Sequence, residues 1–128
     1  TMNLFCHLTS QLKNAIRSNK KFIFFPKTFL CLNFLKLMFL EGFVSHVAEI
    51  NSGKMLKVYL KYSSNGTPSF KDIKLLSKPG KTSYLSYSQL AKLAQGVGVF
   101  IISTNQGLLT SNACLERKIG GNILCYIN

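Results

Sequence analysis

The residues of this chain best suited to chemistry are the four polar ones at Ser103-Thr104-Asn105-Gln106. They follow an apolar run at residues 99–102, which is typical of a buried central strand. Two hydroxyls and two amides carry no charge but donate and accept hydrogen bonds. Gly107 closes the run and permits a tight turn. The pattern predicts a rigid strand that presents small polar groups, suited to contacting hydroxyls and base edges. An ordinary hairpin turn between strands would use the same residues.

The charge of the chain indicates a polyanionic partner. Among 128 residues, 16 are lysine or arginine and four are aspartate or glutamate, so the formal net charge is +12. Because 47% of the residues are hydrophobic, the chain is a folded protein and not a disordered basic tail. Such a surplus on a folded protein favours nucleic acid first and an anionic membrane surface second.

The sequence offers no constellation for catalysis or metal binding. The four carboxylates lie far apart, so they predict neither a general acid–base pair nor a hard-metal site. The four cysteines contain no C-x-x-C pair and form no zinc pattern with the two histidines. No serine lies in a nucleophile elbow. We therefore expect no enzymatic activity, no metal, no cofactor and no small-molecule substrate.

The first part of the chain is predicted to form a helix, a strand and a second helix. Apolar residues at three- and four-residue spacing predict an amphipathic helix over residues 4–18, on which Lys13 and Arg17 share a face. That face is either a solvated basic surface or a set of phosphate contacts. Residues 22–25 are predicted to form a strand, and residues 28–40 a helix buried on nearly all sides. Polar interruptions such as Lys36 argue against membrane insertion.

The remaining pattern predicts an α+β fold of two small domains. Strands are expected at residues 43–50, 55–62 and 70–76, the last after the turn signal Asn65-Gly66, and they form a three-stranded meander. The punctuating segment 77–81 divides an N-terminal α/β domain, 1–76, from a C-terminal domain, 77–128. In the latter we expect mixed β-structure with short helices at residues 88–94 and from about 110 to 118.

Several motifs resemble those of one family. The segments GVFIISTNQGLL at 98–109 and GGNILCY at 120–126 look like the signature of the bacterial-type small-subunit ribosomal protein number eight. SKPG at 77–80, followed by Tyr84, is similar to that family's linker motif. LKNA at 12–15 resembles its first helix, and EGF at 41–43 the end of its second. The likeness covers essentially the whole chain and is weaker before Ile50.

The resemblance implies a two-domain α+β protein that binds a helical stem in the central domain of small-subunit ribosomal RNA. It also implies support of the assembly of that domain, and hence of translation, beside neighbouring small-subunit ribosomal proteins. Small hydroxyl and amide groups can enter the shallow minor groove of RNA, whereas lysine and arginine add phosphate attraction. The implied groove contacts are Ser103, Thr104, Asn105, Gly107, Tyr84 and Asn122. The expected phosphate contacts are Lys78, Lys81, Lys13 and Arg17.

The chain departs from the family pattern at several positions. Asn122 stands where the family usually has glutamate, so that position keeps a hydrogen-bond acceptor and loses its charge. Thr82 replaces an expected arginine, and Phe29 a typical lysine. The acidic and arginine residues usual after Thr110 are also replaced, by Ser111, Asn112 and Leu115.

Composition suggests an organellar gene product. Fourteen lysines against two arginines, together with ten phenylalanines, suggest an AT-rich coding genome. The family's start matches near Met2, so we expect no transit peptide. We predict a mitochondrial ribosome as the location, with a plastid one as the alternative. Two rival functions remain: a non-specific basic RNA chaperone, and a protein that binds a membrane surface through its lysines and residues 22–40.

Overall fold

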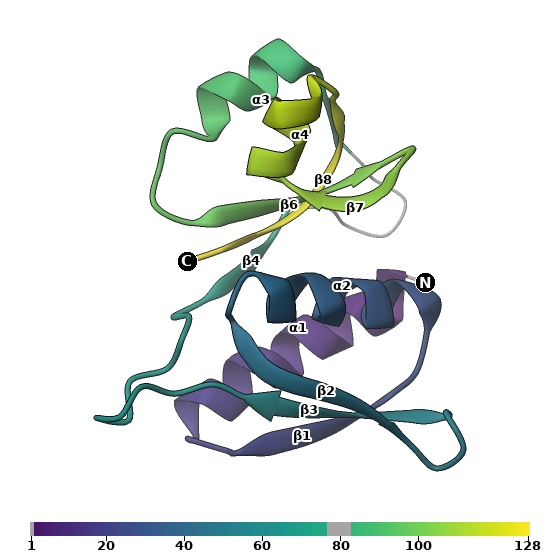
Figure 1. The fold of residues 1–128 in the computed structure, drawn as a ribbon, viewed down its shortest axis with the longest axis vertical. Coiled ribbons are helices and arrows are strands. Elements are labelled where there is room, and N and C mark those ends of the chain that lie inside the picture. Colours follow the sequence, from purple (N-terminus) through teal and green to yellow (C-terminus); the bar gives the residue numbers. More distant parts are fainter. Residues whose placement is uncertain (1, 77–82) are drawn as a thin grey trace. The chain divides into compact units, whose positions relative to one another are not determined.

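Helix α1 (Met2–Arg17) begins the chain in the computed structural model, which describes residues 2–76 and 83–128 (Figure 1). The chain divides into two compact units, Thr1–Lys71 and Asp72–Asn128. The predicted linker, residues 77–81, lies outside the described residues. Each unit is a layer of helices on an antiparallel sheet, which confirms the α+β class.

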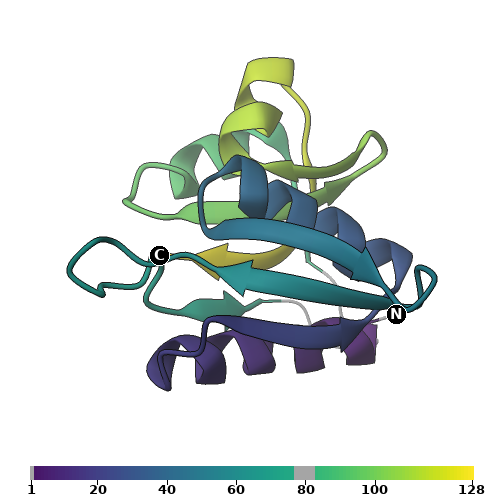
Figure 2. The same cartoon turned by 60° about the horizontal axis from the view of Figure 1, so that its bottom comes forward.

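The first unit pairs its strands in the order β1-β3-β2, where β1 is Phe22–Pro26, β2 Val44–Ile50 and β3 Met55–Leu60. Helices α1 and α2 (Phe29–Leu40) lie against one face of this sheet (Figures 1 and 2). Their apolar stripes meet at Phe5 and Phe34, whose rings pack edge to face with centroids 4.9 Å apart. The sheet contributes the other side of the core. Alternate residues of β3, such as Leu56 and Val58, are buried there.

Helix α2 is less buried than its sequence suggests. It begins as predicted at Thr28, whose hydroxyl accepts a hydrogen bond from the Cys31 amide at 3.2 Å. However, Phe29 and Leu40 are 83% and 75% exposed, so the expectation of burial on nearly all sides was wrong. The sheet and α1 provide partners for only one side of the helix. Among the described residues, no helix is both long and apolar enough to cross a membrane.

The third strand predicted for the first sheet was also placed wrongly. The turn at Asn65-Gly66 forms, with Gly66 at φ +87°, but it leads only to an isolated bridge between Tyr62 and Pro68. Two backbone hydrogen bonds flank this bridge, from the Ser63 amide to the Thr67 carbonyl oxygen and from the Ser69 amide to the Lys61 carbonyl oxygen. The chain then runs into β4 (Ile73–Leu75), which pairs with a strand of the second unit. Strand β1 takes the position beside β3 instead.

The second unit is organised around β8 (Gly121–Ile127), which pairs with β4, with β5 (Ser83–Leu85) and with β6 (Val99–Thr104). Strand β7 (Gly107–Thr110) extends the sheet beyond β6. Helices α3 (Tyr87–Leu93) and α4 (Ser111–Arg117) cover one face. The core beneath them contains Leu90, Ile102, Cys114 and Ile123.

Three of the four cysteines lie in the cores of the two units. Cys31, Cys114 and Cys125 are buried, and no disulfide joins the cysteines of the described residues. Burial raises the pKa of the Cys125 thiol to about 12, which keeps it protonated at neutral pH. In the part of the chain that the structure describes, no cluster of histidine, cysteine and carboxylate side chains could hold a metal ion.

The core of the first unit can be tested with two phenylalanines of α2. Replacing Phe34, which is fully buried, by alanine leaves a large cavity, so we expect the free energy of unfolding to fall by about 3–5 kcal/mol. The matched control Phe29→Ala, at an exposed position of the same helix, should change it by less than about 0.5 kcal/mol. Urea denaturation followed by circular dichroism measures both. Equal losses from the two variants would contradict this packing.

Candidate nucleic-acid interface

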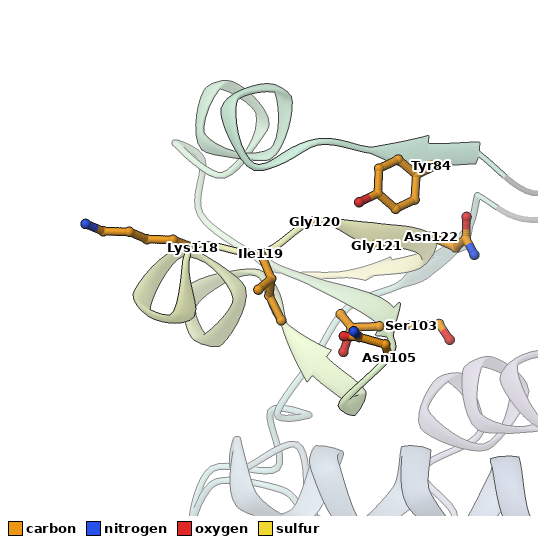
Figure 3. Close-up of a pocket in the computed structure, with 9 residues that line it drawn as sticks. Tyr84, Ser103, Asn105, Lys118, Ile119, Gly120, Gly121 and Asn122 are labelled. Atoms are coloured by element: carbon orange, nitrogen blue, oxygen red, sulfur yellow. The ribbon is translucent and has the colours of Figure 1, made fainter.

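An open hollow of about 540 Å³ lies in the second unit, where β5, the beginning of β8 and the end of β6 meet (Figure 3). In Figure 3 the Tyr84 ring lies on one side of Gly120 and Gly121, and Ser103 and Asn105 lie on the other. The hollow is lined by Tyr84, Ser103, Thr104, Asn105, Lys118, Ile119, Gly120, Gly121 and Asn122.

The polar lining follows from strand register. Asn122 of β8 is opposite both Tyr84 of β5 and Ser103 of β6, so the three residues form one row across the sheet. Directly opposite residues of antiparallel strands point to the same face. The next row, which contains Ile102 and Ile123, is buried under α3 and α4. Alternation therefore places the polar row on the face away from the helices.

Two adjacent glycines let the three strands approach one another. A Cβ at Gly121 would lie 2.5 Å from the carbonyl oxygen of Ser103, and one at Gly120 would lie 2.2 Å from that of Leu85. Both distances are too short for any other residue unless the backbone moves. The glycines thus line the hollow where the strands come closest. They follow Lys118, the left-handed residue at which the preceding helix ends.

The turn between β6 and β7 is held by its own hydrogen bonds. The Thr104 hydroxyl donates to the Gly107 carbonyl oxygen at 2.8 Å and accepts from the Gln106 amide at 3.1 Å. Gly107 has φ +103°, a conformation that favours glycine. Arg117 at the end of α4 donates to the Gln106 side chain at 2.7 Å. The Thr104 hydroxyl is therefore engaged in shaping the turn.

The other polar side chains of the hollow are available to a ligand. Ser103, Asn105 and Asn122 make no side-chain hydrogen bond to the described part of the chain, and Tyr84 is 66% exposed. Lys118 is the one charged residue of the described lining. It adopts the left-handed conformation, φ 57°, that ends α4. The lining can thus donate and accept hydrogen bonds, present an aromatic ring and attract one anion. Its described residues include no histidine, cysteine or carboxylate that could act as nucleophile or base.

The structure brings together five of the predicted site residues: Tyr84, Ser103, Thr104, Asn105 and Asn122. Gly107 shapes the adjoining turn and does not line the hollow. Lys13, half-buried, and Arg17, exposed, lie on α1 of the first unit. Lys78 and Lys81 lie outside the described residues.

Sequence reasoning missed four lining residues: Lys118, Ile119, Gly120 and Gly121. The Gly-Gly pair was the available signal, because adjacent glycines before a strand indicate a close backbone approach as well as a helix end. Lys118 and Ile119 had no such signal. They reach the hollow because the left-handed turn at Lys118 directs the chain from α4 into β8.

The close approach at Gly121 predicts a strong effect of one methyl group. Gly121→Ala should separate β8 from β6 and lower the stability of the second unit by about 1–3 kcal/mol. Gly96→Ala is the matched control, since a Cβ there meets nothing within 4 Å. Thermal denaturation should show a lower midpoint for Gly121→Ala alone. Equal midpoints would contradict the described contact between the strands.

Comparison with known proteins assigns the family. The family model described as ribosomal protein S8 matches residues 4–128. The small ribosomal subunit protein uS8 of Halothermothrix orenii is 30% identical over 122 residues, which cover 94% of this chain and 92% of the relative. That of Bacteroides fragilis is 32% identical over 121 residues and covers 92% of each chain. The protein named uS8c in Oltmannsiellopsis viridis is 34% identical over 121 residues, 94% of this chain and 93% of that one. With this match over nearly its whole length, and with the α+β units described above, the chain belongs to the ribosomal protein S8 family.

Proposed function

We propose that this chain is a structural component of the small ribosomal subunit, not an enzyme, and that it binds a stem of the central domain of the subunit's RNA. The observation that carries the proposal is the row Tyr84–Asn122–Ser103 at the edge of an open hollow, where Lys118 is the one charged residue of the described lining. Binding there would support assembly of the RNA domain and hence translation. The names of the relatives, all of them small-subunit proteins, support this reading.

The chemistry of the hollow suits the minor groove of an RNA stem. That groove is wide and shallow and displays 2′-hydroxyls and base edges, which neutral donors and acceptors can contact. Ser103, Asn105 and Asn122 supply such groups, and the exposed Tyr84 ring supplies an apolar surface for a ribose or an unstacked base. Lys118 would contact phosphate, which positions the RNA without selecting its sequence. Lys78, Lys81, Lys13 and Arg17 would add to this attraction, and neighbouring small-subunit proteins would complete the surroundings.

For the location we propose a mitochondrial ribosome, with a plastid ribosome as the alternative. The lysine-rich, phenylalanine-rich composition supports an organellar gene, and a relative named uS8c is as similar to the chain as the bacterial relatives are. Mass spectrometry of ribosomes purified separately from mitochondria and plastids would decide between the two. Peptides of this chain in cytoplasmic ribosomes alone would contradict both.

Binding to the native stem and to a scrambled stem tests the proposed site. The native protein should prefer its own stem, and the double variant Ser103→Ala/Asn122→Ala should lose about tenfold in affinity for it, because two ligand hydrogen bonds are removed. Ser18→Ala, at an exposed serine of the first unit, serves as the matched control and should bind like the native protein. Equal affinity of the native protein for both stems would instead favour the RNA chaperone. Binding to vesicles, without a preference for the native stem, would favour the membrane-surface protein.

The role of Lys118 can be separated from that of the neutral residues by measuring how the affinity for RNA depends on salt concentration. Lys118→Gln should weaken binding to the native stem and lower the slope of log affinity against log salt by about 1, because one phosphate contact is lost. Lys92→Gln, at an exposed lysine of α3 outside the hollow, is the control and should keep the native slope. An unchanged slope in Lys118→Gln would remove this residue from the interface.

A further inference from the structure

The sheet of the first unit exposes an aromatic surface that the proposed function does not use. Its register places Phe22 of β1, Tyr59 of β3 and His46 of β2 in one row, and Phe24 and Lys57 in the next. The intervening residues of β1 and β3 are buried. Helices α1 and α2 lie on the other side of the sheet (Figure 2). We call these five residues, Phe22, Phe24, His46, Lys57 and Tyr59, the aromatic face.

The rings of the aromatic face form a continuous cluster. The centroids of Phe22 and Phe24 are 5.4 Å apart, those of Phe22 and Tyr59 6.1 Å, and those of His46 and Tyr59 5.7 Å. Phe22 and Phe24 remain 40% and 46% exposed. Grouped apolar exposure of this kind is uncommon on a soluble surface and indicates a binding surface. Sheet formation alone does not account for it, because polar β-formers such as threonine would pair equally well at these positions.

A lysine occupies the centre of this cluster. The Nζ atom of Lys57 lies 4.2 Å from the ring centroid of Phe22, 5.0 Å from that of Tyr59 and 5.7 Å from that of Phe24. Attraction to the rings holds the ammonium group over the surface, where an unconstrained lysine would extend into water. An incoming anion therefore meets a charge that is already positioned among the rings.

The sign of the charge indicates what binds there. Glu49 is the only carboxylate on these three strands, and it lies opposite Leu56, in register with the buried residues. Glu49 is paired with Lys27, whose hydrogen bond and charge lower the pKa of that carboxyl. The aromatic face thus carries a cation and no anion. Its partner should combine negative charge with flat apolar surfaces.

We propose that the aromatic face binds unpaired RNA by stacking bases on Phe22, Phe24 and Tyr59 while Lys57 contacts phosphate. Single-stranded nucleic acid alternates flat bases with anionic phosphates, and protein sheets bind it through aromatic rings with little sequence preference. Phe22 and Phe24 are two residues apart on β1, so their Cα atoms are separated by roughly 6.6 Å. Each ring can therefore take a separate base of an RNA strand whose bases are splayed apart. This site is distinct from the hollow of the second unit, which is proposed to bind a paired stem.

The test is binding of the full chain to a twelve-nucleotide oligouridylate, with the native stem measured in parallel. Phe22→Thr/Phe24→Thr keeps residues that favour strands and should weaken oligouridylate binding at least tenfold while leaving stem binding unchanged. Phe29→Ala, at an exposed phenylalanine outside the aromatic face, is the matched control. Lys57→Gln should lower the salt slope for oligouridylate by about 0.7, and Lys54→Gln, at the β2–β3 turn, should not.

Further measurements keep the outcome clear. Circular dichroism verifies that the variants are folded. In Phe22→Trp, oligouridylate should quench the fluorescence of the only tryptophan in the chain. Undiminished oligouridylate binding by Phe22→Thr/Phe24→Thr would overturn the proposal. Binding to vesicles that contain phosphatidylserine is measured in parallel. If Phe22→Thr/Phe24→Thr lost only vesicle binding, the proposal would also be overturned, and the face would be assigned to a lipid surface. Loss of stem preference in Ser103→Ala/Asn122→Ala bears only on the hollow, so the two sites can fail independently.

Discussion

The second unit depends on how closely the start of β8 approaches its neighbours. At Gly120 and Gly121 the backbone lies against the end of β5 and against β6, with no room for a Cβ. This contact aligns Tyr84, Asn122 and Ser103 in one row and leaves the hollow beside them. It also sets the inward row, because the same register buries Ile102 and Ile123 beneath the helices. A single backbone constraint thus determines both the polar surface and the core.

The proposed division of labour between charged and neutral groups follows from the chemistry of RNA. A net charge of +12 attracts any polyanion, and such attraction weakens with salt and carries no sequence information. Selection requires groups that distinguish hydroxyls and base edges. In the described hollow these groups are neutral, apart from Lys118. Asn122, where the resemblance leads one to expect glutamate, extends this neutrality.

Local patterns predicted the elements well where neighbouring residues alone decide them. The buried strand that begins at Val99, the cap at Thr28 and the Asn65-Gly66 turn were all recognisable from the sequence. The strand is longer than predicted, since it includes Ser103 and Thr104, which were expected in the loop. The pairing of β4 with β8 was not, because strand partners separated by some 50 residues leave no mark on local alternation. The incomplete burial of α2 was missed for the same reason, since periodicity cannot show which neighbours a helix has. At the hollow, side chains of expected chemistry were found, whereas the backbone contributions of Gly120 and Gly121 were recognised only from distances.

The place of β8 in the chain has a consequence for synthesis. Strands β4, β5 and β6 all pair with β8, yet β8 is the last of the described strands to be translated. The sheet of the first unit needs nothing beyond Leu60 and can form while later residues are still being made. The second sheet cannot be completed before β8 is made, so β4 and β5 have no strand partner until then. A growing chain can therefore form the aromatic face before the hollow, so the two candidate surfaces are completed in a set order.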